Sequence, residues 1–429
     1  MRDRRRVEPF STVCDEDPER FDSRNAKGAL ASKHRMRTGP RIMFAAIPLA
    51  GAVALVCCGQ DSSAPSVADA APQPRPPAEL DAAPIDAAPV DAAPIGDASL
   101  DAANASDAGH DAADAADAAQ TPPISSSCAG AHPGAAHDCG PNGDDDCCGS
   151  PALPGGTFKR SYDNVSLTDP SFPATVSPFD LDTYEITVGR YRAFVEAGKG
   201  TRANPPAAGA GAHPKIPGSG WNPDWNANLP QDTASLRTLV ACNSIYQTWT
   251  DAPGANEARA MNCLNWYDVF AFCAWDGKRL PTEAEWNYAA AGGDEQRVYP
   301  WSSPATSTSV ERVNASYNEG APNECMGDGI AGCSVTDILP VGTKREGRGR
   351  WGHSDLGGNI WEWALDVYAD PYPSASCADC ANLTASGSQR VIRGGGYFSG
   401  PTYMRAGYRE GYLATARDGG FGGRCARTP

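Results

Sequence analysis

The feature that most constrains this chain is its content of 15 cysteines. Three of them, Cys14, Cys57 and Cys58, lie within residues 1–61 near the N-terminus, and the remaining 12 are an even number. Two pairs sit close together in the sequence, Cys147/Cys148 and Cys377/Cys380, and neither has the spacing or the histidine partners of a zinc site. The cysteines therefore predict disulfides and an oxidising compartment.

The N-terminal part, residues 1–61, has the features of an export signal. The apolar run from Ile42 to Val56 follows two arginines and is too short to span a bilayer comfortably, as in a signal peptide. Leu55-Val56-Cys57-Cys58 resembles a bacterial lipobox with Cys58 acylated, and plain cleavage with secretion is the alternative. Because residues 1–35 are polar, we expect translation to start at Met36 or Met43. The sequence predicts a lipoprotein of the bacterial cell envelope, in the periplasm or on the cell surface, or a secreted protein.

Residues 62–127 form a segment rich in Ala, Asp and Pro that repeats Asp-Ala-Ala-Pro. It has almost no large apolar side chain, so burial cannot offset the entropy of ordering it, and we expect an extended stalk. Between Asp69 and Gln120 the ten Asp, one Glu and one Arg sum to −10 of the chain's net charge of −16. The acidity therefore belongs mostly to this segment, and a role in binding nucleic acid has no electrostatic support, so we expect none.

After a Cys-rich segment at 128–150, residues 151–429 read as one globular domain. Alternating residues from Ser177 to Thr187 predict a half-buried strand. Residues 188–197 predict a helix whose Tyr191, Phe194 and Val195 share a core-facing side. Residues 265–275 predict a second helix, and the capping box of Thr282 and Glu285 begins another.

Five motifs follow one another in this domain. They are Pro-Gly-Gly-Thr-Phe at 154, Gly-Lys-Arg-Leu-Pro-Thr-Glu-Ala-Glu-Trp at 277, Gly-Gly-Asn-Ile-Trp-Glu-Trp at 357, Arg-Gly-Gly-Gly-Tyr at 393 and Gly-Gly-Arg-Cys-Ala at 422. In this order they resemble the formylglycine-generating enzyme, or sulfatase-modifying factor, family. The resemblance implies an α+β fold related to C-type lectins, with little regular secondary structure and long ordered loops. Seven of the ten Trp lie between Trp266 and Trp363, which agrees with a core of packed aromatic rings.

Members of this family bind two calcium ions, which take six to eight oxygen ligands each. By resemblance, the first site would use the side chains of Asn314 and Asp328 with the carbonyls of Ala315 and Ile330. The second would use the side chains of Asn359 and Glu362 with the carbonyl of Ile360. The alternative for Asn359 is a turn residue after Gly357-Gly358, and for Glu362 a solvated helix charge. We expect calcium to be a structural cofactor.

The resemblance also pairs Cys273 with Cys425 in a structural disulfide. A second disulfide of the family has no counterpart, because Ala290 and Arg409 occupy its two positions. The remaining cysteines suggest the local pairs Cys242–Cys263, Cys325–Cys333 and Cys377–Cys380, and the pairing among Cys128, Cys139, Cys147 and Cys148 stays open.

In active members, a serine precedes the tyrosine of the Arg-Gly-Gly motif, and two cysteines five residues apart bind copper(I) and activate oxygen to oxidise a substrate cysteine. The serine position here is Gly396, and the two cysteine positions are Ser399 and Met404. Copper(I) requires soft thiolate ligands, so the sequence predicts no copper and no confident catalytic residue.

Ser399 as a hydrolytic nucleophile would need a base, and His353 is the only histidine in this half of the domain. Its place in a Gly-rich turn predicts a surface residue rather than a base. The glycines at 394–396 lack the Lys-Ser/Thr of a phosphate-binding loop, so a tight turn is the better interpretation.

The leading hypothesis is a non-catalytic binding or scaffold ectodomain for a protein or glycan ligand, contacting membrane only through the lipid. The sequence does not specify an oligomeric state. The alternative is an oxidoreductase of the formylglycine-generating type that acts on a protein cysteine through Ser399, Met404 and His353. A third hypothesis is a lectin-like surface formed by the Trp221–Trp225 loop and the Tyr403–Tyr412 segment, and buried packing of these aromatics is its alternative.

Overall fold

The structure is a computed structural model that describes residues 125–429, except 131, 321–322, 375 and 385–387. The predicted export signal, the lipobox and nearly all of the predicted stalk lie outside the described residues. Among the described residues, no helix has the length and apolar character needed to cross a membrane.

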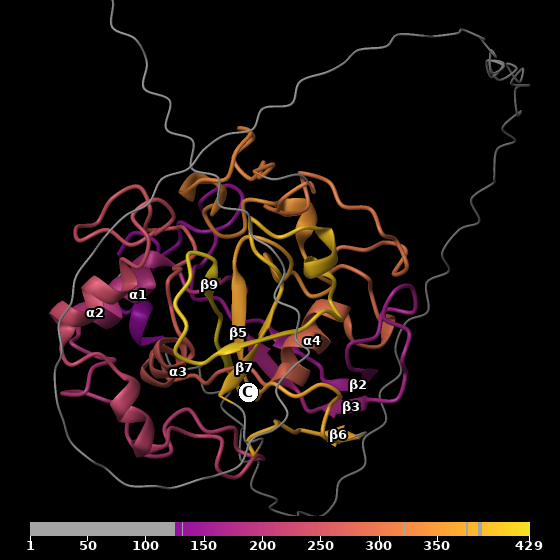
Figure 1. Cartoon of the computed structure of the whole chain (residues 1–429), viewed down its shortest axis with the longest axis horizontal. Coiled ribbons are helices and arrows are strands. Elements are labelled where there is room, and N and C mark those ends of the chain that lie inside the picture. The colour runs from indigo at the N-terminus through magenta and orange to yellow at the C-terminus, as the bar shows by residue number, and fades with distance from the viewer. Residues whose placement is uncertain (1–124, 131, 321–322, 375, 385–387) are drawn as a thin grey trace, which may run out of the picture. The chain divides into compact units, whose positions relative to one another are not determined.

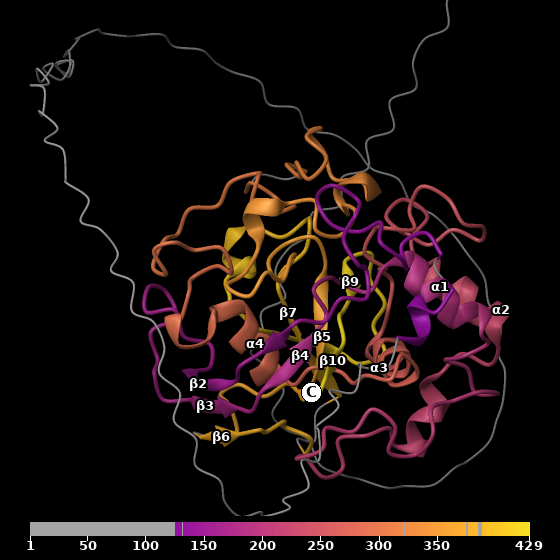
Figure 2. The same ribbon diagram turned by 180° about the vertical axis from the view of Figure 1, so that it is seen from behind.

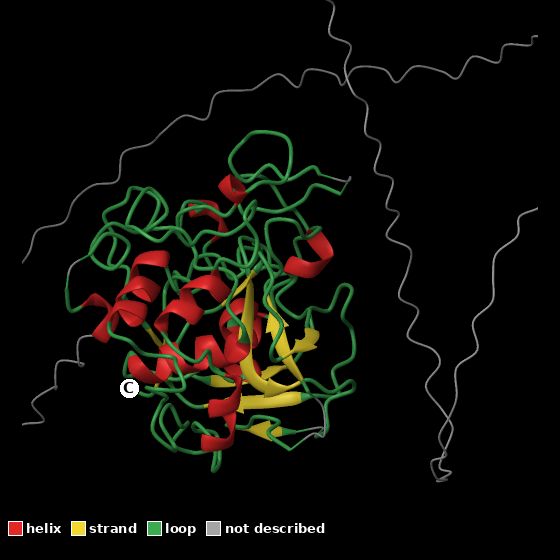
Figure 3. Cartoon of the chain, turned by 60° about the vertical axis from the view of Figure 1, so that its left-hand side comes forward, coloured by secondary structure: helices red, strands yellow, loops and turns green. Residues whose placement is uncertain are grey.

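The described residues contain four α-helices and ten short strands. Figure 3 shows that long loops connect them. The α-helices are α1 (Val188–Glu196), α2 (Thr233–Val240), α3 (Trp266–Trp275) and α4 (Glu283–Ala291). The 3₁₀ turns are η1 (Ser126–Cys128), η2 (Pro223–Asn228), η3 (Gly293–Glu295), η4 (Val335–Asp337), η5 (Arg345–Gly347) and η6 (Pro401–Met404). The predicted α+β class with little regular secondary structure is confirmed.

The ten strands form three small sheets. One has the order β1 (Ala152–Leu153), β4 (Phe179–Leu181), β10 (Ala426–Arg427), and a second has the order β2 (Gly156–Lys159), β3 (Pro173–Val176), β6 (Cys377–Ala378). The third has the order β8 (Glu410–Leu413), β7 (Gln389–Arg393), β5 (Trp361–Val367), β9 (Phe421–Gly422). In this third sheet β5 pairs antiparallel with β7 and parallel with β9.

All seven residues of β5 are buried, and the arrangement of the helices explains why. Figures 1 and 2, seen from opposite sides, place α1, α2 and α3 on one side of the sheet containing β5 and α4 with β2 and β3 on the other. A strand covered on both sides carries apolar residues at successive positions instead of alternating ones. The centre of this sheet is therefore the common wall of the two halves of the core.

The predicted helices are present, and their caps are the ones that local chemistry requires. Tyr191, Phe194 and Val195 of α1 are all buried, as the periodicity predicts. Thr282 and Glu285 exchange side-chain and backbone hydrogen bonds at the start of α4, which confirms the predicted capping box.

The strand predicted from Ser177 to Thr187 is too long. Only Phe179–Leu181 of that range is a strand, and Thr187 caps the N-terminus of α1. The reason lies at Asp182, whose buried carboxylate accepts hydrogen bonds from Arg190 at 3.0 Å and Lys278 at 2.6 Å. The chain leaves the sheet here because this carboxylate binds two cations instead of continuing the alternation.

The 12 cysteines of the described residues form six disulfides. Cys273–Cys425 joins α3 to the C-terminal segment, and the three predicted local pairs are present. The open pairing resolves as Cys128–Cys148 and Cys139–Cys147.

Of the two positions without cysteines, Arg409 is linked to the helix that contains Ala290 by a different interaction. Arg409 donates to Oε1 of Glu283 at 2.5 Å and to Oε2 at 3.0 Å, and Glu283 is the first residue of α4. Ala290 is buried in the same helix. An ion pair therefore connects the helix and the segment that the resemblance joins through a disulfide.

Candidate functional site

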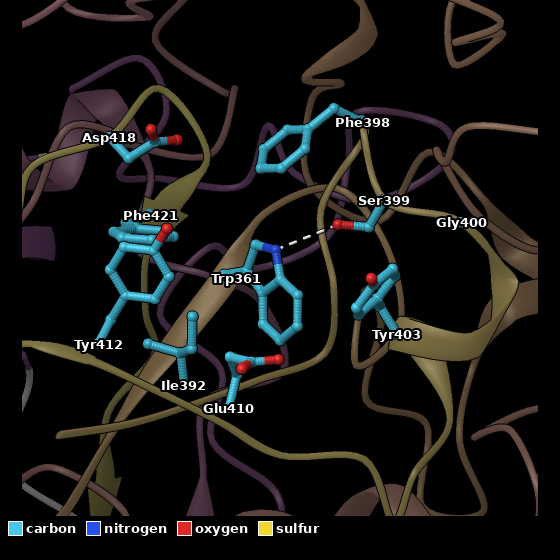
Figure 4. A pocket seen from close by; sticks show the side chains of 10 residues that line it. All are labelled: Trp361, Ile392, Phe398, Ser399, Gly400, Tyr403, Glu410, Tyr412, Asp418 and Phe421. Atoms are coloured by element: carbon cyan, nitrogen blue, oxygen red, sulfur yellow. Dashed lines mark hydrogen bonds between the residues drawn. The ribbon is translucent and has the colours of Figure 1, made fainter. Parts of the chain in front are cut away.

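A cavity of about 440 Å³ opens over one face of the third sheet, and we call it the Ser399 cavity (Figure 4). Each strand of the sheet contributes to it, and the loop after β7 and the turn before β9 complete the wall. The lining residues are Trp361, Ile392, Phe398, Ser399, Gly400, Tyr403, Glu410, Tyr412, Asp418 and Phe421. Four short strands and two loops thus bring together residues that are up to 60 positions apart in the sequence.

The Ser399 side chain fixes the loop that forms one wall of the cavity. Its Oγ accepts hydrogen bonds from the indole Nε1 of Trp361 at 3.1 Å and from the backbone N–H of Gly396 at 3.0 Å. Both lone pairs of the hydroxyl are thereby used by donors. Ser399 is a positioning residue for Trp361 and the turn at 394–399, and its oxygen is not presented to a metal.

Met404 occupies the second position of the family's cysteine pair and has a different environment. Its side chain is fully buried in a cluster with Val298, Tyr299 and Tyr317. It is not one of the described residues that line the cavity. The two positions therefore differ in role, since Ser399 faces the cavity and Met404 fills the core.

His353 is buried rather than on the surface, so the prediction of a surface residue is wrong. It is 1% exposed, and its Nε2 donates to the carbonyl of Leu181 at 3.1 Å. Burial, followed by the nearby positive charge of Arg424, lowers the pKa of His353 to about 3. His353 is absent from the described lining of the Ser399 cavity. The structure does not bring it to Ser399 as a base.

In the first predicted calcium set, the side chains of Asn314 and Asp328 make hydrogen bonds within the protein. Asn314 accepts from the N–H of Glu311 at 2.9 Å and donates to the carbonyl of Glu346 at 3.0 Å. Asp328 accepts from the N–H of Ile330 at 2.8 Å and from the hydroxyl of Thr336. Ala315 is buried and the side chain of Ile330 is exposed. Calcium at this set stays a prediction.

The second predicted set lies in the buried interior. Asn359 has a φ of 62° directly after Gly357-Gly358, which supports its role as a turn residue. Its amide donates to Glu185, and its Oδ1 accepts from the N–H of Leu339 at 2.9 Å. The N–H of Ile360 donates to the other carboxylate oxygen of Glu185 at 3.2 Å.

Glu362 is a buried residue of β5, so the alternative of a solvated helix charge is wrong. Its carboxylate accepts two hydrogen bonds from Arg424, both at 2.8 Å, and one from the indole of Trp286 at 3.0 Å. The bidentate geometry is the strong form of an arginine–carboxylate pair.

Two further carboxylates near this set, Glu185 and Asp355, were missed by the sequence reasoning. Both are buried, and Asp355 accepts from the N–H of Gly342 at 2.6 Å. Burial raises the pKa of Glu185 well above its usual range, and the charges of Asp355 and Glu362 raise it further. Burial likewise raises the pKa of Asp355 to about 6. Asp355 lies two residues before the Gly-Gly pair of the motif at 357, whereas Glu185 has no local signal.

Glu185, Asp355, Glu362 and Arg424 form what we call the Arg424 cluster. Three carboxylates face one guanidinium, and the ionised cluster therefore has an excess of negative charge in a buried site. Such an excess is costly without a cation or a proton. The ligand atoms of the cluster's three carboxylates do not all lie within 4.8 Å of one another; among the described residues, the group of His, Cys, Asp or Glu side chains that does is Asp138, Cys139 and Cys147, and its two cysteines are joined in a disulfide.

A second cavity, of about 420 Å³, adjoins the first and shares Phe398 and Asp418 with it. Its other lining residues are mostly polar: Asn243, Tyr246, Asn318, Asn323, Cys333, Tyr397 and Gly419.

The predicted aromatic loop at Trp221–Trp225 contributes no residue to either of these two cavities. Trp221 is buried with its ring 5.6 Å from that of Phe270, so the packing alternative is confirmed for Trp221. Tyr403 and Tyr412, in contrast, are exposed at the Ser399 cavity.

Residues 137–429 match the sequence model of the family described as "Sulfatase-modifying factor enzyme 1-like domain". The match covers well over half of the chain, and the chain belongs to this family. The predicted resemblance is confirmed.

Among curated relatives, the chain is similar to the formylglycine-generating enzyme of Thermomonospora curvata, with 27% identity over 66% of this chain and 94% of the relative. It is 30% identical to the formylglycine-generating enzyme of Streptomyces coelicolor, over 65% of this chain and 88% of the relative. It is also 28% identical to a protein of Bos taurus named "Inactive C-alpha-formylglycine-generating enzyme 2", over 56% of this chain and 79% of the relative. Among solved structures, PvdO from Pseudomonas aeruginosa matches with a TM-score of 0.44 and 22% identity, over 66% of this chain and 95% of PvdO.

Proposed function

We propose that this chain is a non-catalytic member of its family, an exported binding or scaffold domain that uses the Ser399 cavity as its ligand site. The observation that carries the proposal is the chemistry at the family's cysteine pair. One position is a hydroxyl that already accepts two hydrogen bonds, and the other is a thioether in the core. The 12 cysteines of the described residues are all in disulfides, so none of them offers a thiolate to copper(I).

The comparisons are compatible with this proposal. A relative with 28% identity bears the name of an inactive formylglycine-generating enzyme, which is a statement about that protein. The alternative, oxidation of a protein cysteine through a variant site, has less support. It would need His353 beside Ser399, but the Nε2 of His353 donates to the carbonyl of Leu181 and His353 does not line the Ser399 cavity.

Export, a lipid anchor at Cys58 and calcium complete the proposal. The described residues contain six disulfides, and disulfides form and persist mainly in oxidising compartments outside the cytosol, which supports export. The excess negative charge of the Arg424 cluster supports a bound cation, because oxygen-rich acidic sites are those that calcium prefers. In the second predicted set the side chains of Asn359 and Glu362 and the carbonyl of Ile360 would hold it, and its charge would offset that of the neighbouring carboxylates Glu185 and Asp355.

Copper binding tests the central claim. The purified chain is titrated with copper(I) against a competing chelator, and we expect no stoichiometric binding. The double variant Ser399→Cys/Met404→Cys serves as the matched control, since it restores the thiol pair. Stoichiometric copper(I) in the wild type that disappears in Met404→Ala would overturn the proposal, as would conversion of a cysteine-containing peptide to formylglycine.

Calcium is tested separately by melting the chain in calcium and in a chelator. We expect chelation to lower the melting temperature by several degrees, and Asn359→Ala and Asp328→Asn to remove the contributions of calcium at the two predicted sites. Asp294→Asn, at an exposed carboxylate paired with Arg350, is the control. Equal melting with and without calcium would remove calcium from the proposal and leave the copper result unaffected.

A further inference from the structure

Aromatic side chains form much of the wall of the Ser399 cavity. Five of its ten lining residues are aromatic: Trp361, Phe398, Tyr403, Tyr412 and Phe421. Trp361 is almost fully buried at the base, whereas Phe398, Tyr403 and Tyr412 are 39%, 42% and 46% exposed. Figure 4 shows their rings around the opening. Aromatic faces that are held open to solvent around a hollow are the kind of apolar surface that marks a binding site.

Two carboxylates, Glu410 and Asp418, are the charged groups among these ten residues. Tyr408 donates its hydroxyl to Glu410 at 2.6 Å, and the N–H of Gly420 donates to Asp418 at 2.9 Å. Neither carboxylate takes part in any of the ion pairs of the described residues. The cavity therefore has two negative charges that no side chain of the described part neutralises.

The nearest basic residues in the sequence are committed elsewhere. Arg409 immediately precedes Glu410, and its guanidinium binds both oxygens of Glu283. Arg417 immediately precedes Asp418, and its guanidinium binds both oxygens of Asp268. Each arginine thus pairs with a buried acid that does not line the cavity, while the adjacent carboxylate does line it. In both segments, 409–410 and 417–418, the positive charge is therefore paired away from the cavity and the negative charge is left at it.

Aromatic faces combined with unpaired carboxylates attract organic cations. The negative face of a ring stabilises a nearby ammonium group, and an anion at the rim adds charge attraction. An anionic ligand would be repelled by both carboxylates. A metal ion would need six or more oxygen ligands, and most of this lining is aromatic or aliphatic.

Resting on the proposed function, we propose that the Ser399 cavity binds a methylated ammonium group, carried by a small molecule or by a lysine side chain of a protein. Methyl groups can pack directly against the rings, whereas a primary ammonium would need an acceptor for each of its three N–H groups. The volume of about 440 Å³ leaves room for the chain that carries the cation. The adjoining polar cavity, reached past Phe398 and Asp418, can receive its continuation.

The first test compares two probes of equal shape. Choline and its neutral isostere 3,3-dimethylbutan-1-ol are titrated into the full chain, and binding is measured by calorimetry. We expect choline to bind at least about tenfold more tightly, because only choline has the charge. Equal affinity for the alcohol would show a simple apolar cavity and overturn the proposal, and so would absence of binding by both choline and a trimethyllysine peptide at millimolar concentration.

Variants locate the binding. Glu410→Gln and Asp418→Asn should each weaken choline about tenfold, which corresponds to about 1.4 kcal/mol. Tyr412→Ala should weaken it similarly, while Tyr412→Phe, which keeps the ring, should bind as the wild type does. Glu196→Gln, at an exposed carboxylate in the last turn of α1, is the matched charge control. Choline affinity that is unchanged in all three weakening variants would place the binding elsewhere and overturn the proposal.

Two peptides distinguish the source of the cation. One carries trimethyllysine and the other the same sequence with unmodified lysine. Tighter binding of the trimethyllysine peptide than of choline supports a protein ligand, and equal binding supports a small molecule. These results are independent of the copper titration: loss of the cation site leaves the non-catalytic proposal intact, and stoichiometric copper would refute that proposal whatever choline does.

Discussion

Trp361 and Glu362 are neighbours on β5, yet they belong to two contrasting regions. Successive side chains of a strand point to opposite faces of the sheet. Trp361 forms the base of the Ser399 cavity, and Glu362 enters the Arg424 cluster. Both regions are acidic. In the Arg424 cluster the negative charge surrounds a buried arginine, and in the Ser399 cavity it faces solvent without a partner.

Charged residues on the two faces of this sheet thus have different roles: those of the Arg424 cluster maintain the fold, and those of the Ser399 cavity are available to a ligand. Arg424 uses its whole guanidinium, donating to Glu362 and to the carbonyls of Asp182, Thr183 and Ser354. Removing a partner from such a network leaves other buried groups unsatisfied, so this region maintains the fold. We expect that the carboxylates of the cavity can be changed with little structural consequence, because no ion pair of the described residues includes them. Substitutions in the Ser399 cavity could therefore change ligand binding without destabilising the Arg424 cluster.

The largest expected effect comes from the disulfide next to Arg424. Cys273→Ala/Cys425→Ala opens a closed loop of 152 residues, and in the chain-entropy model this lowers the free energy of unfolding by about 5 kcal/mol. Denaturant unfolding measures it. Cys377→Ala/Cys380→Ala, which opens a three-residue separation, is the control and should cost about 2 kcal/mol. Equal losses would contradict the entropic explanation.

Removal of the buried guanidinium should be next in size. Arg424→Met leaves Glu362 ionised and without its partner, and should cost about 3–5 kcal/mol of unfolding free energy. Arg312→Met, at an exposed ion pair with Glu319, should change it by less than about 1 kcal/mol. Similar values for both variants in denaturant titrations would show that the cluster has no special role in stability.

Asp366, also on β5, makes the buried side sensitive to pH. Burial, followed by the charge of Glu283, raises the pKa of Asp366 from 3.8 to about 7. Between these values the folded state holds a proton that the unfolded chain releases, so stability falls as pH rises from about 4 to about 7 and then levels off. The slope from this residue should approach about 1 kcal/mol per pH unit.

The matched variant for this slope is Asp366→Asn. Melting across pH 4–8 should give a flatter profile than the wild type, and the difference between the two curves isolates Asp366 from other buried acids. Parallel curves would mean that Asp366 stays ionised in the folded protein.

The smallest expected effect lies on the cavity side. Glu410→Gln retains an oxygen that accepts from Tyr408 and removes a charge that has no ion-pair partner among the described residues. We expect the free energy of unfolding to change by less than about 0.5 kcal/mol. A loss of several kcal/mol would show that Glu410 belongs to the structural framework, and the contrast between the two regions would then fail.

Features fixed by neighbouring residues could be predicted from the sequence. The capping box of Thr282 and Glu285 depends on contacts three residues apart, and the buried face of α1 depends on one helical period. The Cys273–Cys425 pair came from resemblance rather than from any local rule. The α+β fold followed from five motifs whose order is itself long-range information.

Features made by distant residues could not be predicted. Glu185 meets Asn359 across 174 positions, and no periodicity points to that contact. The predicted strand from Ser177 to Thr187 failed because the alternation rule does not register that Asp182 binds Arg190 and Lys278 in the interior. The cavity escaped prediction for a similar reason, since Tyr412 and Asp418 acquire their roles only when β8 and β9 join the same sheet.

The nested disulfides at the start of the domain have a mechanical consequence. Cys139–Cys147 lies within the loop closed by Cys128–Cys148, and Ser127 is bonded to Asp276 and Arg190 of the folded core. Tension applied to the chain ahead of Ser125 would pass across the outer disulfide, bypassing 20 residues that could otherwise lengthen by roughly 66 Å. The segment enclosed by this disulfide would therefore not extend under tension, and the pulling force would act directly on the folded domain near β1.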